Sequence, residues 1–347
     1  MGQPHIPSIP AGTKLTNKTV VVTGANAGLG LEAARQYLAL DAKRVILAVR
    51  SVTKGEEAKE HLLNHPSVKS VNPNADIIVM ALDLDDEASV VKFASKVKSE
   101  LDVLDVLLLN GGVNIMNYQT SKNGHERVMQ VNYHSNALLA LELLPLLEST
   151  ASVRGSPSRL TFVGSVGMSM HTLKKQPLGE KESVAQRFDD KTKYASFQRY
   201  SDSKLMVAAF AEELAEHVPA NKVIINYLCP GMVSTGFDAH LPFWLKSIMA
   251  LVRWSRARNV DEGARTYIHA TSVKGAETHG KFVRNNELAE YVFTISLYSD
   301  NGLTLRCVRS DAILSQPEGA VLRKKAWNEA LQDAEKFDPQ FKRRGLI

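Results

Sequence analysis

The stretch TVVVTGANAGLG, residues 19–30, is the strongest indication of the fold. Its first half is short, apolar and β-branched, which is typical of a strand buried on both faces. LEAARQYLAL, residues 31–40, then reads as a helix. A strand, a glycine-rich turn and a helix in this order predict a dinucleotide-binding unit, because the helix N-terminus presents N–H groups and a positive dipole end to phosphates.

Three glycines in the turn have separate tasks. Gly24 can adopt a conformation closed to other residues, Gly28 lets the backbone approach a pyrophosphate, and Gly30 lets the helix pack close to the sheet. The spacing differs from the common G-x-G-x-x-G, and an ordinary glycine turn is the alternative. We expect Asn26 and Leu29, which lie between these glycines, to take part in the same site.

Downstream, short apolar runs alternate with longer amphipathic ones. This pattern predicts a single-domain, Rossmann-like α/β fold, a doubly wound parallel sheet spanning residues 18–347 after an extended lead-in at 1–17. Further strands are expected at 44–49, 76–82, 104–110, 159–165, 222–228 and 280–283. Further helices are expected at 54–63, 87–101, 200–217 and about 125–148, the last ending near Pro145.

The bulk composition excludes several classes. The net charge of +5 includes no run of five Lys or Arg, so nucleic acid is not an expected partner. Two cysteines predict neither disulfides nor a Cys-rich metal site. No stretch approaches 18 apolar residues and the N-terminus lacks a signal-peptide pattern, so we expect a cytoplasmic protein. No metal is expected, because the histidines lack ligand spacing and most should lie at the surface: His61, His65, His125, His134 and His217.

The end of the second strand indicates the cofactor. An NAD site carries an acidic residue there, whereas this chain has Val49 followed by Arg50 and Ser51. Arginine suits a 2′-phosphate, so NADP(H) is favoured over NAD; the alternative for Arg50 is a solvated surface charge.

Two later strand ends extend this site. Asp83 and Leu84 are expected to flank the adenine, although Asp83 could equally cap a helix. Asn110, Gly111 and Gly112 supply small residues where a cofactor passes close, although a plain turn has the same composition.

Two segments match Tyr-x-x-x-Lys: YQTSK at 118–122 and YSDSK at 200–204. A tyrosine is a poor acid at neutral pH, and a nearby ammonium lowers its pKa. The two groups share a face only on a helix. Asn123-Gly124 marks a turn directly after the first match, whereas the second leads into the apolar periodicity of residues 205–218. We therefore assign the chemistry to Tyr200 and Lys204.

With these motifs in order, the chain resembles the short-chain dehydrogenases/reductases. The motifs are TGANAGLG (23–30), NGG (110–112), VN (131–132), VGS (163–165), YSDSK (200–204) and PGMVST (230–235). The resemblance covers residues 18–236 well and 260–283 more loosely. Residues 48–58 and 200–215 are most similar to the retinol-dehydrogenase-like and fungal secondary-metabolism branches.

The resemblance implies a role for each matched residue. Tyr200 would be the general acid, and Lys204 would hold the nicotinamide ribose and lower the Tyr200 pKa. Ser165 would bind the substrate carbonyl, and Asn132 would hold a water in the proton relay. The nicotinamide would lie against the PG motif, through Pro230, Gly231, Val233 and Thr235.

The expected activity is NADPH-dependent reduction of a ketone or aldehyde, or the reverse alcohol oxidation, on a medium-sized apolar metabolite. The alternative is an NADP(H)-binding protein with a non-redox or structural role. The resemblance also implies a homodimer through helices 125–148 and 200–217.

Three segments depart from the alternating pattern. The polar stretch 166–199 is longer than the family usually has and is expected to be a loop. Residues 237–258 are expected to form a substrate lid; the alternatives are a core helix or weak contact with a membrane surface. Residues 288–306 are irregular and have no counterpart in the family.

Overall fold

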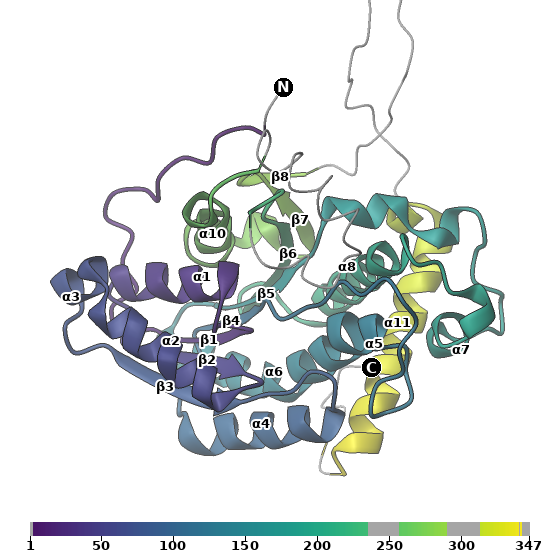
Figure 1. Ribbon diagram of the computed structural model, residues 1–347, viewed down its shortest axis with the longest axis horizontal. Coiled ribbons are helices and arrows are strands. Elements are labelled where there is room, and N and C mark those ends of the chain that lie inside the picture. The colour runs from purple at the N-terminus through teal and green to yellow at the C-terminus, as the bar shows by residue number, and fades with distance from the viewer. Residues whose placement is uncertain (1–2, 235–256, 290–312, 340, 342–347) are drawn as a thin grey trace, which may run out of the picture.

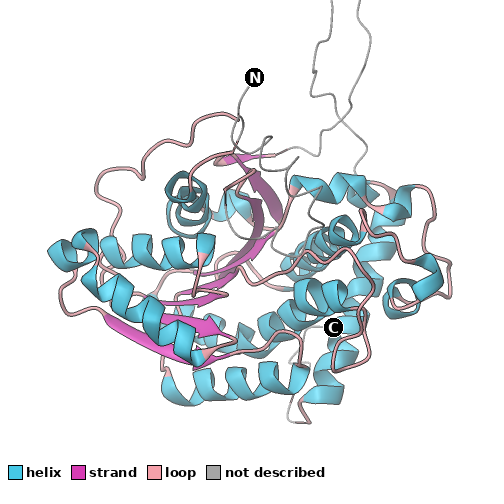
Figure 2. Cartoon of the chain, in the orientation of Figure 1, coloured by secondary structure: helices cyan, strands magenta, loops and turns pink. Residues whose placement is uncertain are grey.

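A central sheet runs through the molecule with helices on both faces (Figures 1 and 2). The computed structural model describes residues 3–234, 257–289, 313–339 and 341. The strand order is β3-β2-β1-β4-β5-β6-β7-β8, and only the last pairing, β7 with β8, is antiparallel among these strands. The strands are β1 Thr19–Thr23, β2 Arg44–Val49, β3 Asp76–Ala81, β4 Val106–Leu109, β5 Ser158–Val163, β6 Val223–Cys229, β7 Lys281–Arg284 and β8 Glu287–Leu288. The predicted doubly wound parallel fold is confirmed.

Two hydrophobic clusters enclose the sheet. On β1, Val20 and Val22 point into one cluster and Val21 into the other, as expected of a strand buried on both faces. One face carries α1 Gly28–Ala39, α2 Val52–Asn64, α3 Pro66–Val71 and α10 Val260–Ile268. The other carries α4 Glu87–Glu100, α6 Ser135–Arg154, α8 Arg199–His217 and α11 Pro317–Phe337. Of these, α3, α10 and α11 were not expected from the sequence.

The central helix is longer than predicted. The short helix α5 (Arg127–Met129), the π-turn η1 (Gln130–His134) and α6 form one continuous helix that passes through Pro145. It ends at Gly155, whose φ is +65°. Ending it near Pro145 was wrong, because burial of neighbours such as Leu144 and Leu147 offsets the cost of a proline inside a helix.

Among the described residues, Arg127–Arg154 is also the one helix long and apolar enough to cross a membrane. Its most apolar window is 67% buried inside the protein, as in a core helix.

Helix α11 lies across α6 and α8 (Figure 1). The Trp327 ring stacks on those of His217 and Phe210, with centroid distances of 4.5 and 5.9 Å. The Tyr133 hydroxyl donates to the Ala326 carbonyl over 2.7 Å. Helix α11 thus packs against the two helices through which the homodimer is expected.

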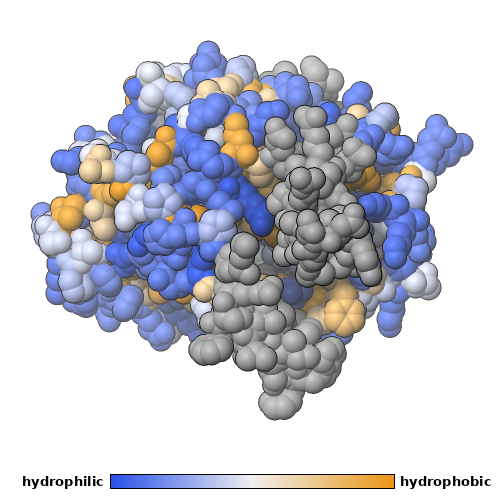
Figure 3. All heavy atoms as spheres, turned by 90° about the horizontal axis from the view of Figure 1, so that it is seen from above, coloured by the Kyte–Doolittle hydropathy of each residue, from blue (hydrophilic) through white to orange (hydrophobic). Residues whose placement is uncertain are grey.

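The polar stretch 166–199 is a loop with four short helical segments, in keeping with its sequence: η2 Val166–Met170, η3 Thr172–Lys174, α7 Val184–Phe188 and η4 Lys191–Lys193. Most of the expected lid, most of the irregular segment and Thr235 lie outside the described residues. Figure 3 shows hydrophilic residues and scattered apolar ones over the described part of one face. Among the described residues, the large apolar side chains that are exposed lie on different elements: Val52, Val71, Val153, Met170, Phe197, Leu288 and Val321.

Candidate active site

The glycine turn between β1 and α1 has the backbone of an anion-binding site. Gly24 and Gly28 have φ of +66° and +56°, a region that favours glycine. A Cβ on Gly30 would lie 2.5 Å from the Gly24 carbonyl oxygen, so only glycine fits there. The N-cap residue of α1, Ala27, makes no side-chain capping bond. The first N–H groups of α1 can therefore bind a phosphate.

The segment after β4 packs against this turn. The Asn110 side-chain amide donates to the Thr23 carbonyl over 2.8 Å, and the Gly111 N–H donates to Thr23 Oγ1 over 2.8 Å. A Cβ on Gly111 would lie 2.6 Å from Leu84 Cδ1. The structure therefore brings Leu84, Asn110 and Gly111 to the end of β1, as the cofactor site requires.

Arg50 and Ser51 occupy the neighbouring strand end. Arg50 is exposed directly after β2, and Ser51 caps α2. The Gly24 N–H donates to the Ala48 carbonyl over 2.8 Å, which fixes the end of β2 beside the glycine turn. Val49 is buried, so its position offers no polar group to a ribose.

Asp83 has a different role from the capping alternative. Helix α4 is capped by Asp86, whose carboxylate accepts from the Ala88 and Ser89 N–H groups. Asp83 instead accepts from the Asp85 N–H over 3.1 Å and forms an ion pair with Lys122 at 3.4 Å. Its carboxylate is partly buried at the end of β3, close to Leu84.

The two Tyr-x-x-x-Lys segments differ in structure as predicted. YSDSK forms the first turns of α8, so Tyr200 and Lys204 share a helix face. YQTSK lies outside the described helices, and its Tyr118 hydroxyl donates to the Asp189 carbonyl over 2.7 Å.

Lys204 is buried beside Tyr200. Its Nζ lies 5.6 Å from the centre of the Tyr200 ring and donates to the Val163 carbonyl, at the end of β5, over 2.7 Å. Burial lowers the pKa of Lys204 to about 8. The hydrogen bond to Val163 ties Lys204, on α8, to the end of the strand that precedes Ser165.

Asn132 lies on the π-turn η1, and the backbone of Val113 binds both polar atoms of its side-chain amide. Its Oδ1 accepts from the Val113 N–H over 2.7 Å, and its Nδ2 donates to the Val113 carbonyl over 2.9 Å. A Cβ on Gly112 would lie 3.1 Å from Asn132 Oδ1 and 3.6 Å from Lys204 Nζ. Gly112, Asn132 and Lys204 therefore converge on one point.

Two residues inside YSDSK that the sequence did not single out support these groups. Ser203 Oγ accepts from Asn132 Nδ2 over 2.9 Å and donates to the Tyr200 carbonyl over 2.7 Å. Asp202 accepts from the N–H and hydroxyl of Thr172 over 2.7 and 2.9 Å. Burial raises the pKa of Asp202 to about 6. The only sequence signal was their position in the motif.

Ser165 caps the segment that follows β5. Its Oγ accepts from the Gly167 N–H over 3.0 Å, which is the local role that serines commonly have. A hydroxyl that accepts one hydrogen bond still has a hydrogen to donate. Because Asp202 holds Thr172, the segment after Ser165 is fixed against α8.

The PG segment follows β6. Pro230 is buried, and Gly231 has φ of +82°. A Cβ on Gly263, in α10, would meet both Val233 and Leu29 side chains within 3 Å. Val233 and Leu29 therefore pack against the same point of α10, which brings the PG segment to the glycine turn.

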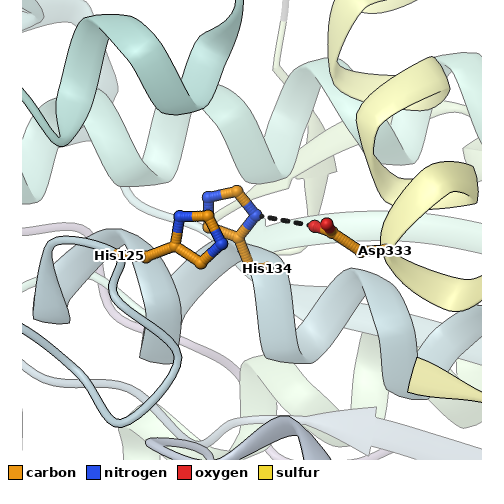
Figure 4. Close-up of side chains that lie close together, drawn as sticks. All are labelled: His125, His134 and Asp333. Atoms are coloured by element: carbon orange, nitrogen blue, oxygen red, sulfur yellow. Dashed lines mark hydrogen bonds and ion pairs between the residues drawn. The ribbon is translucent and has the colours of Figure 1, made fainter. Parts of the chain in front are cut away.

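Two histidines form a cluster that the sequence did not predict (Figure 4). The rings of His125 and His134 stack at 4.3 Å with an interplanar angle of 12°. His134 Nδ1 lies 3.1 Å from an Asp333 oxygen, and His125 Nδ1 lies 2.8 Å from an Asp189 oxygen. His134 is buried and His125 mostly so; the expectation of surface positions was wrong for this pair.

The cluster has the residue types of a metal site, with candidate ligand atoms of His125, His134 and Asp333 within 4.8 Å of one another. The nitrogen lone pairs lie in the planes of the two rings, and these planes are nearly parallel, whereas an ion needs lone pairs that converge. Burial opposes protonation of His125, but the hydrogen bond and charge of Asp189 raise its pKa overall. We therefore interpret the cluster as a buried set of hydrogen bonds that joins the 166–199 loop, η1 and α11.

Comparison with known proteins places the chain in a family. The model of the family described as short chain dehydrogenase matches residues 18–174. The short chain dehydrogenase sor7 of Hypocrea jecorina is 48% identical over 305 residues, which cover 86% of this chain and 85% of that protein. This chain belongs to the short-chain dehydrogenases/reductases.

Other relatives of this short-chain dehydrogenase/reductase are similar over nearly their full length. The short-chain dehydrogenase/reductase tropG of Talaromyces stipitatus is 40% identical, with 95% of each chain covered. Among solved structures, the NADPH-bound carbonyl reductase from chicken fatty liver has a TM-score of 0.58 at 20% identity, covering 80% of this chain and 94% of that one. That likeness supports the fold, and the curated fungal relatives agree with the fungal branch of the resemblance.

Proposed function

We propose that the protein is an NADPH-dependent reductase that converts a ketone or aldehyde of a medium-sized apolar metabolite to the alcohol, in fungal secondary metabolism. The observation that carries this proposal is the convergence of Asn132 and Gly112 on Lys204, which lies one turn after Tyr200 on α8. This convergence lies at the edge of the sheet formed by the carboxyl ends of β4 and β5, and the glycine turn follows the carboxyl end of β1 at the same edge. The fungal short-chain dehydrogenases among its relatives support the branch.

The residues present suit a dinucleotide. The glycine turn, the uncapped N-terminus of α1 and Asn110–Gly112 would hold it, and the bound cofactor would supply the hydride. Arg50, exposed at the end of β2, suits a 2′-phosphate, and buried Val49 offers no carboxylate to a ribose hydroxyl. These features favour NADPH over NADH. We accordingly expect Arg50→Asp to lose the preference for NADPH, as measured by the ratio of kcat/KM values for the two cofactors.

The proton comes from the protein. Tyr200 donates it to the carbonyl oxygen, and the Ser165 hydroxyl stabilises the negative charge that develops there. The Lys204 ammonium, fixed by the Val163 carbonyl, favours the phenolate that Tyr200 becomes. Asn132, held by Val113, would keep a water in line with Lys204 for reprotonation.

The test is a screen of aliphatic and aromatic ketones and aldehydes, followed through NADPH absorbance at 340 nm. With NADPH deuterated at C4, the label should appear on the carbinol carbon of the product. Tyr200→Phe should lower kcat by roughly 100-fold or more while NADPH still binds. Full activity in Tyr200→Phe would contradict the mechanism. Product formed without label transfer would favour the non-redox alternative.

A further inference from the structure

The start of the chain holds the segment that follows β6. The Gln3 side chain pairs with both backbone groups of Met232, 229 positions away: its Nε2 donates to the Met232 carbonyl, and its Oε1 accepts from the Met232 N–H, each over 2.8 Å. A primary amide that uses a donor and an acceptor on one residue fixes both the position and the rotation of that peptide. Gln3 therefore binds both backbone groups of Met232, as a residue of a neighbouring strand would.

Arg258 holds the same segment from a second side. Its guanidinium is buried and donates to the carbonyls of Pro230 and Pro4 over 3.0 and 2.7 Å, and to Asn285 Oδ1 over 2.6 Å. The Arg258 backbone also pairs with the segment, since its N–H donates to the Met232 carbonyl over 3.0 Å. One side chain thus joins the N-terminus, the PG segment and the β7–β8 turn.

Gly231 lies directly between these two side chains. Its φ of +82° favours glycine, and a Cβ there would overlap with Gln3 Oε1 and an Arg258 nitrogen. The two polar groups therefore pack against the bare backbone of the PG motif. The shape of this turn depends on both of them.

The N-terminal segment is itself anchored. The Ile6 side chain is fully buried, its N–H donates to Glu262 over 2.6 Å, and its carbonyl accepts from Arg265 over 3.2 Å. Glu262 and Arg265 both lie on α10, the helix against which Val233 packs. Residues 3–6 are thus tied to the element that supports the other side of the PG segment.

We propose that Gln3 and Arg258 are positioning residues that hold residues 230–233 in the shape that receives the nicotinamide half of the cofactor. This inference rests on the proposed function, in which the PG segment binds the nicotinamide. The adenosine half depends on the glycine turn and on Arg50, which neither Gln3 nor Arg258 contacts among the described residues. We call the contacts of Gln3 and Arg258 with residues 230–233 the clamp. Loss of the clamp should therefore weaken binding of the nicotinamide half and leave binding of the adenosine half unchanged.

The experiment compares two ligands on the full-length protein. NADPH carries both halves, whereas 2′,5′-ADP carries only the adenosine half with its 2′-phosphate. Gln3→Met keeps the length of the side chain and removes both hydrogen bonds to Met232. We expect it to raise the Kd for NADPH about 10-fold and to leave the Kd for 2′,5′-ADP within about 2-fold, as measured by isothermal titration calorimetry.

Thr13→Ala is the matched control, because Thr13 belongs to the same lead-in and its hydroxyl bonds only locally, to the Pro10 carbonyl. It should change neither Kd. An unchanged NADPH affinity in Gln3→Met, or an equal loss for both ligands, would overturn the clamp while the wild-type protein still binds NADPH. A wild-type protein that binds neither ligand would instead overturn the proposed function, and the clamp with it.

Discussion

At the scale of single residues, the motif YSDSK contains more than the tyrosine and lysine that define it. Tyr200 and Lys204 lie on one face of α8, while the residues between them hold the surroundings in place. Ser203 contacts Asn132 on η1, and Asp202 contacts Thr172 in the segment after Ser165. Each of the inner residues can therefore be tested apart from the chemistry itself.

Ser203→Ala tests the support of Asn132. The change removes one acceptor of the Asn132 amide but leaves its two contacts with Val113. We expect kcat to fall roughly 10-fold and the KM for NADPH to stay within about 2-fold, because a loosened relay slows proton transfer without touching the cofactor. Ser203→Thr keeps the hydroxyl and should restore most of the rate. Equal rates in the wild type and Ser203→Ala would contradict this role.

Asp202→Asn tests the cost of a buried carboxylate. Asp202 has a pKa of about 6 in the folded protein, above the value of 3.8 for a free side chain. The folded state therefore binds the proton more tightly, and the stabilisation that this contributes is lost as the pH rises through 6. In Asp202→Asn, the free energy of unfolding should fall less between pH 4 and 7 than in the wild type. At pH 8 the variant should therefore be more stable than the wild type by roughly 1–3 kcal/mol.

Urea unfolding at pH 5 and pH 8 measures this difference. The control is Asp102→Asn, because Asp102 is exposed and should leave the pH dependence of the wild type intact. A variant that is less stable than the wild type by the same amount at both pH values would show that the Thr172 contacts, rather than the charge, dominate at this position.

At the scale of elements, α11 completes the core on one side of the sheet. Trp327 is nearly fully buried between rings on α8. The Tyr133 hydroxyl, on η1, donates to the carbonyl of the preceding residue, Ala326. The Asp333 carboxylate, on the same helix, contacts His134 (Figure 4). Because His134 lies two positions after Asn132, α11 supports the helix that carries a residue of the proposed site.

Trp327→Ala tests this support. Removal of a buried indole should lower the free energy of unfolding by about 3–5 kcal/mol, since a cavity adds to the lost burial. Val321→Ala on the same helix is the control, because Val321 is 53% exposed and should change the stability by about 0.5 kcal/mol or less. Denaturant unfolding followed by circular dichroism measures both. A loss below about 1 kcal/mol in Trp327→Ala would mean that α11 contributes little to the fold.

At the scale of the whole molecule, α11 changes the expectation for assembly. The homodimer inferred from the family needed exposed faces on the central helix and α8, and α11 packs on both of them. A stable dimer usually buries about 800 Å² per partner. We therefore expect a monomer of 38.2 kDa in size-exclusion chromatography with light scattering. A species of twice this mass would show that another surface associates or that α11 is displaced.

The alternation of strands and helices, the glycine turn and the helical position of Tyr200 as opposed to Tyr118 were predictable from the sequence alone. Each of these depends on residues close together in the chain, so that a period of 3.6, a run of β-branched residues or an Asn-Gly turn leaves a visible pattern. The strand predictions accordingly fell within two residues of the observed ends. Locally, the main miss was the helix that continues through Pro145, where burial in the core outweighed the preference of one residue.

The residues that surround that framework come together only when the chain folds. Gln3 and Met232 are 229 positions apart, and His134 and Asp333 are 199 apart; no local pattern marks either pair. The burial of Asp202, and with it the raised pKa, exists only once Thr172 is folded onto α8. The physical reason is the same in each case: periodicity records which face of an element is apolar, but not which distant element that face will meet.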